Sequence, residues 1–108
     1  MTFMRDHRRY ERVPVNIPAT IRQSGRFIPA TILNLSEDGM LVVADDCDVT
    51  SGASLEATFD LANEKDVSVV CRVRHCERTD EVATLGVQFK TLASKGCKVV
   101  RDFVSERI

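Results

Sequence analysis

Three arginines lie close together near the start of the chain, in the segment Arg8-Arg9-Tyr10-Glu11-Arg12. A guanidinium group can bind two phosphate oxygens at once, lie over the face of a purine, or donate to the Hoogsteen edge of guanine. Residues 1–12 hold four arginines against two acids. We therefore expect these residues to form a mobile basic arm that binds an anionic ligand.

A second polar segment, Asn34-Leu35-Ser36-Glu37-Asp38-Gly39, follows a stretch rich in apolar residues. Residues two apart point to the same side of a strand, so the Asn34 amide and the Ser36 hydroxyl are predicted to face one ligand. Gly39 would then allow a turn conformation that other residues rarely adopt. Taken separately, the two segments are also explained by a basic tail and by an ordinary hairpin turn.

The residue types needed for catalysis are present but are not grouped. His7 and His75 are the two histidines, and neither has an evident nucleophile in register with it. The chain has no Walker-type phosphate loop, no HExxH motif and no paired acids at a catalytic spacing. The sequence therefore predicts a binding protein and not an enzyme.

The cysteines are four in number and include no CxxC pair: Cys47, Cys71, Cys76 and Cys97. Cys71 and Cys76 are five positions apart, which predicts opposite faces of a strand and disfavours a shared zinc ion. Free cysteine is commonly a small buried residue in a reducing compartment. We expect structural thiols, with no bound metal and no cofactor.

The net charge of −1 conceals an uneven distribution of charge along the chain. Seven acids and a single lysine lie between Asp45 and Asp66, which argues against a nucleic acid polymer as partner. The longest apolar run, Met40 to Ala44, is too short to span a bilayer. Residues 1–11 do not resemble a signal peptide, so the sequence predicts no membrane span and a cytoplasmic location.

Alternation of apolar and polar residues after the arm predicts an all-β fold. Turns are expected at residues 23–26, 36–39 and 62–66, with a solvated loop at 45–52, and Pro18 suggests an edge or a bulge. Six short strands favour a closed antiparallel barrel, because closure leaves no exposed edge. The expected strands are Val15–Ile21, Phe27–Leu35, Met40–Ala44, Leu55–Leu61, Val67–Val73 and Ala83–Phe89.

The last segment changes to a period of three and four residues, at Cys97, Val100, Phe103 and Val104. This period predicts an amphipathic C-terminal helix over about residues 94–107, capped by Ser94. We expect the helix to cover one opening of the barrel. Residues 13–108 would then form a single domain.

The two polar segments, in this order, resemble the motifs of the PilZ family of cyclic di-GMP receptors. That family is marked by RxxxR, often with a further arginine, followed by Asp/Asn-x-Ser-x-x-Gly. The second motif is matched without departure, and residues 85–89 resemble the family's late glycine-containing strand. The matching positions are Arg8, Arg9, Arg12, Asn34, Ser36 and Gly39.

The resemblance implies a six-stranded barrel with a C-terminal helix, bacterial second-messenger signalling, and cyclic di-GMP as ligand. The three arginines would wrap over the ligand while Asn34 and Ser36 read a guanine edge and Gly39 admits the ligand or holds the turn. His7 precedes the first motif and leaves open one or two nucleotides per protomer. Ordering of the arm would pass the signal to an unidentified downstream protein in motility, polysaccharide synthesis or transcription.

Two other functions compete with nucleotide reception. The family includes interaction modules that do not bind nucleotide, although those usually lack the motif residues that are intact here. A small barrel with a basic arm could also bind single-stranded nucleic acid, which relies on aromatic stacking. The chain has no tryptophan, one tyrosine and five phenylalanines, mostly at core positions of the alternation.

Overall fold

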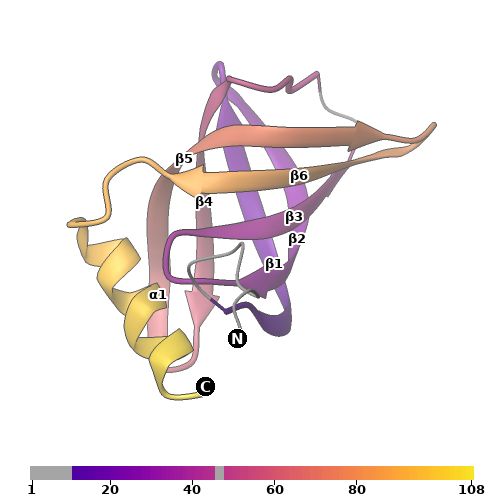
Figure 1. Cartoon of the computed structure of the whole chain (residues 1–108). Coiled ribbons are helices and arrows are strands. Elements are labelled where there is room, and N and C mark those ends of the chain that lie inside the picture. Colours follow the sequence, from indigo (N-terminus) through magenta and orange to yellow (C-terminus); the bar gives the residue numbers. More distant parts are fainter. Residues whose placement is uncertain (1–10, 46–47) are drawn as a thin grey trace.

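The computed structural model describes residues 11–45 and 48–108. Within these residues six strands form a closed antiparallel barrel, and a helix follows (Figure 1). The strands pair in the order β1-β2-β3-β6-β5-β4, and β4 closes onto β1. The predicted fold class is confirmed. The elements are β1 (Val13–Gln23), β2 (Arg26–Leu35), β3 (Gly39–Asp45), β4 (Ser54–Leu61), β5 (Glu64–Arg78), β6 (Val82–Phe89) and α1 (Lys95–Ser105).

The hairpin turns follow from residues that tolerate the left-handed conformation. Ser24 and Gly25, between β1 and β2, have φ of 53° and 79°, which suits the twist of the flanking strands. The β4–β5 connection is tighter than the predicted 62–66, because β5 resumes at Glu64. The Asp60 carboxylate accepts a hydrogen bond from the Asp66 backbone N–H at 2.9 Å, which holds the two strands together beside the turn.

Pro18 lies on a part of β1 that is paired on one side. It is in register with β2, whereas the pairing of β1 with β4 begins one residue later, at Ala19. A bulge between Pro14 and Ile17 precedes it. The proline therefore lies at a partly free edge next to a bulge, the two settings in which its missing N–H is tolerated.

Strand β5 continues to Arg78, beyond the predicted end at Val73, and forms with β6 a long hairpin whose tip projects away from the helix (Figure 1). A bulge between Val73 and His75 interrupts its alternation. After this bulge Cys76 packs against the core, as Cys71 does before it. The prediction that the two cysteines lie on opposite faces was wrong, because the bulge adds one residue to the count.

The core consists of the inward side chains of all six strands together with one face of the helix, including Cys97, Val100 and Val104. Ser94 caps α1, as predicted, and accepts a hydrogen bond from the Cys97 N–H at 3.2 Å. The helix packs against β5 and β4. A side chain at Gly96 would collide with the Ser68 carbonyl oxygen, so glycine lets the helix approach β5 closely.

Residues 48–53 connect β3 to β4 and are not wholly solvated as expected. Val49 is buried, and its carbonyl oxygen accepts hydrogen bonds from the Arg78 guanidinium and the Cys76 thiol. These contacts fix the connection to the outer part of β5. Asp48 is exposed, as expected for a solvated loop.

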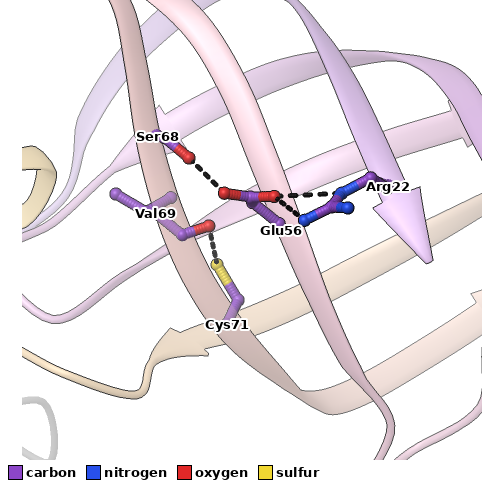
Figure 2. Close-up of polar contacts among 5 residues, drawn as sticks. All are labelled: Arg22, Glu56, Ser68, Val69 and Cys71. Carbon is purple, nitrogen blue, oxygen red and sulfur yellow. Dashed lines mark hydrogen bonds and ion pairs between the residues drawn. The ribbon is translucent and has the colours of Figure 1, made fainter. Parts of the chain in front are cut away.

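Glu56 links three strands on the outer surface (Figure 2). Its carboxylate accepts hydrogen bonds from Ser68 on β5 at 2.6 Å and from Arg22 on β1 at 2.6 Å. These two bonds, the serine bond first, lower the pKa of Glu56. On the inner side, burial and the neighbouring Cys97 raise the pKa of Cys71 to about 12, which keeps this thiol protonated.

Candidate functional site

The two polar segments of the sequence meet at the start of β1. The Arg12 guanidinium donates a hydrogen bond from Nη1 to Asn34 Oδ1 at 2.9 Å, across 22 positions of sequence. The contact follows from strand register, since Val13 lies opposite Leu35 and Pro14 opposite Asn34. The residue that precedes β1 is therefore placed beside the end of β2.

Ser36 belongs to the turn between β2 and β3 and not to the surface that carries Asn34. It is 1% exposed. Its hydroxyl accepts from the Gly39 N–H at 3.1 Å and lies 3.0 Å from Asp38 Oδ1 and 3.2 Å from the Gly39 carbonyl oxygen. The shared face expected for Asn34 and Ser36 is not formed, because Leu35 and Ser36 are both buried and alternation ends there.

Gly39 is required for a reason other than the one predicted. Its φ is not in the left-handed region, which in the described chain contains Gly25 and Gly52 among the glycines. A Cβ at Gly39 would instead overlap the backbone carbonyl of Val87. Glycine thus allows β3 to begin in close contact with β6, and the Phe89 N–H bonds to the Asp38 carbonyl at 2.8 Å beside it.

A continuous row of outward residues joins Asn34 to the far side of the site. Strand register places Asn34 opposite Leu41, Leu41 opposite Gly86, and Gly86 opposite His75. These four residues come from β2, β3, β6 and β5, and all four are at least partly exposed. The row therefore crosses four adjacent strands on the outer surface of the barrel.

A shallow pocket of about 340 Å³ opens next to this row. Two guanidinium groups and one imidazole line it, with one carboxylate. That carboxylate, Asp38, lies within hydrogen-bonding distance of the Ser36 hydroxyl and belongs to the turn. The charge balance suits an anion. The lining residues are Arg12, Asp38, Gly39, Arg74, His75, Gly86, Val87 and Gln88.

Of the eight lining residues, two, Arg12 and Gly39, were predicted as site residues. The sequence indicated no ligand contact for His75 or Gly86, and Arg74 lies in neither of the two polar segments. Packing does not require glycine at position 86, because an added Cβ would meet only the Cβ of His75, at an ordinary 3.6 Å. The available signal was the polar run after Val73, where apolar alternation stops although the strand continues.

Several predicted features lie outside the described residues. They include Arg8, Arg9, His7 and Cys47, with most of the basic arm. In the described ranges no three His, Cys, Asp or Glu side chains come together in a way that could hold a metal ion. Nor does this part of the chain contain a helix of the length and apolarity needed to cross a membrane.

The described residues thus form a small closed barrel with an arginine-lined pocket beside a tight Ser-Gly turn. The family model described as PilZ domain matches residues 6–106. The chain belongs to the PilZ family, whose domains act as regulatory receptor modules.

Two solved structures share this fold. The PilZ domain of YcgR from Escherichia coli, solved with c-di-GMP, has a TM-score of 0.77 and 10% identity, over 94% of this chain and 91% of that one. The inhibitor of motility MotI/DgrA of Bacillus subtilis has a TM-score of 0.78 and 20% identity, over 94% of this chain. The matched part is 51% of MotI, so this chain spans about half of that protein's length. No curated protein sequence matches the chain.

Proposed function

We propose that this protein is a cyclic di-GMP receptor that binds the nucleotide at the pocket beside Arg12 and Asn34. The observation that carries the proposal is the 2.9 Å bond between these two side chains, which brings both family motifs together beside an arginine-lined pocket. The ligand reported with the E. coli YcgR domain has the matching chemistry, since it carries two phosphates and two guanines.

Arg12 and Asn34 can keep their mutual bond and still bind ligand. A guanidinium has five N–H donors, and Arg12 uses one of them on Asn34. The remaining donors can bind a phosphate or the O6 and N7 acceptors of guanine. The Asn34 oxygen accepts the bond from Arg12, and the NH₂ group of the same side chain can donate to a guanine acceptor.

Ser36 and Gly39 act in this proposal through the turn that they form. The buried Ser36 hydroxyl ties the turn together, and the missing Gly39 side chain lets β3 begin against β6. Together they hold Asn34 and the pocket wall in place. Arg8 and Arg9 are proposed to add two more guanidinium groups over the bound ligand, as the family motif implies.

Binding is proposed to have a regulatory and not a catalytic outcome. The arm of residues 1–12 would become ordered over the nucleotide, at a folding cost that lowers the net affinity. The changed surface would then be recognised by a downstream protein. The name of MotI/DgrA, an inhibitor of motility, gives one example of such an output in a protein of this fold.

Calorimetric titration of the purified protein tests the proposal, with cyclic di-GMP compared against GTP and a short single-stranded oligonucleotide. Saturable binding of cyclic di-GMP alone is the expected result, and the titration also gives one or two nucleotides per protomer. No binding of any of the three would favour an interaction module without nucleotide. Binding of the oligonucleotide alone would favour the nucleic acid function.

A further inference from the structure

Strand β5 turns two consecutive basic residues outward beside the pocket. Val73 is buried and Cys76 packs against the core. In a regular strand, a single outward residue separates two successive inward residues. The bulge leaves two, Arg74 and His75, and only His75 has a partner residue on β6. Bulges of this kind often redirect a side chain next to a functional site.

Among the arginines of the described residues, Arg74 is unusual in having no hydrogen-bond or ion-pair partner there. Eight arginines lie in residues 11–45 and 48–108, and seven of them make a hydrogen bond or an ion pair. Arg74 makes neither within this part of the chain, although it is exposed beside the His75–Glu77 pair. Its five donors are therefore available to a ligand.

Arg12 and Arg74 line the same pocket, Arg12 beside Asn34 at one end of the row and Arg74 beside His75 at the other. The row from Asn34 to His75 spans three strand spacings, roughly 14 Å at about 4.8 Å each. Gly86 lies within this row, and no packing contact requires it to be glycine. The absence of a side chain there keeps the pocket floor open between the two ends.

We propose that Arg74 binds one phosphate of the cyclic dinucleotide while Arg12 engages the other half of the ligand. The nucleotide would lie along the row, over Leu41 and Gly86. This inference rests on the proposed function, since it assigns a second set of contacts in the same pocket. It makes Arg74 a binding residue that neither sequence motif contains.

The test compares cyclic di-GMP affinity, measured by calorimetry, for the wild type and the variants Arg74→Ala, Arg72→Ala and Gly86→Val. Arg72 is the matched control, because it lies on the same strand with the same charge but reaches the Gly52 carbonyl and does not line the pocket. We expect about tenfold weaker binding or more for Arg74→Ala, the usual scale for a charged hydrogen bond. The affinity of Arg72→Ala should stay within about twofold of the wild-type affinity, because only the long-range effect of one exposed charge is lost.

Gly86→Val should bind more weakly while its unfolding midpoint in urea stays near that of the wild type, because the valine methyl groups would occupy the pocket floor. As a direct readout, the Arg74 side-chain Nε–H resonance should shift when cyclic di-GMP is added. Equal affinity of wild type and Arg74→Ala would overturn this inference and leave the proposed function standing, as would equal losses in Arg74→Ala and Arg72→Ala. A wild type that does not bind cyclic di-GMP would overturn both.

Discussion

Arg12 and Asn34 hold each other in position through their hydrogen bond, so each change at this pair would remove both a proposed ligand contact and the other residue's support. We expect Arg12→Ala and Asn34→Ala each to weaken cyclic di-GMP binding by roughly 1.5 to 3 kcal/mol, the scale of a charged hydrogen bond or a bidentate base contact. Calorimetry on the purified variants measures this loss.

Lys98→Ala is the control for that prediction. Lys98 lies on α1 and pairs with Asp102 at 3.8 Å, outside the pocket. Its removal should leave the affinity unchanged within error. A loss equal to that of Arg12→Ala would mean that general positive charge, and not this site, attracts the nucleotide.

Two glycines beside the pocket should differ in how much stability they lose when a methyl group is added. Gly39→Ala places a Cβ against the rigid carbonyl of Val87, and we expect a loss of roughly 1 to 3 kcal/mol in the free energy of unfolding, as for other overpacked positions. Gly86→Ala meets only an ordinary contact and should change stability little. Urea unfolding of the two variants gives the comparison, and equal stabilities would contradict the steric role given to Gly39.

At the scale of elements, Glu56 on β4 joins β1 to β5 through Arg22 and Ser68 (Figure 2). Its lowered pKa means that the folded state favours the carboxylate, so the stabilisation is present above the ordinary pKa of 4.5 and is lost as the pH falls through the lowered value. We expect Glu56→Gln to be less stable than the wild type at pH 7, by about 1 kcal/mol or less because the pair is partly exposed.

The difference between wild type and Glu56→Gln should shrink in urea unfolding curves recorded from pH 7 down to pH 3. Glu81→Gln serves as the matched control, since Glu81 is exposed and makes no hydrogen bond or ion pair in the described chain. A stability difference that stays constant over this pH range would show that Glu56 acts through packing and not through its charge.

The elements show why alternation predicted the barrel but not all of the site. β3, β4 and β6 were found within one residue of their observed bounds, because each buries every second side chain over most of its length. The period fails at bulges, and the site uses two of them, at Ile32/Asn34 and at Val73/His75. The polar run after Val73 marks the segment, but an extra residue in a strand leaves no mark in the composition, so the outward pairing of Arg74 and His75 was not predicted.

At the scale of the whole molecule, the pocket depends on the order in which the strands pair. It gathers Arg12 from before β1, Gly39 from β3, Arg74 from β5 and Gln88 from β6, residues that only strand pairing brings together. The sequence motifs identified the half formed by Arg12 and the β2–β3 turn. In the β5–β6 half, the resemblance at residues 85–89 covers Gly86 and Gln88, whereas Arg74 belongs to no motif and is brought to the pocket by strand register.

The proposed output depends on how residues 1–12 respond to the filled pocket. Their sequence is rich in charge, contains few sizeable apolar side chains, and has no strand or helix period that would hold it against the barrel. Bound cyclic di-GMP would place negative charge beside Arg12 and give the arm's guanidinium groups partners in a partly desolvated site, where charge-assisted bonds are strongest.

We therefore predict that residues 5–10, which precede the Arg12–Asn34 contact, have low backbone order parameters without ligand and markedly higher ones with it, measured by ¹⁵N relaxation of the backbone amides. Residues of α1, such as Val100 in the core, should give the same values in both states and serve as the internal control. Arg12→Ala should bind weakly and leave the arm's order parameters low at ligand concentrations that saturate the wild type. An arm that is already rigid without ligand would leave cyclic di-GMP binding intact but would exclude arm ordering as the signal, because no change of surface would then accompany binding at this end of the chain.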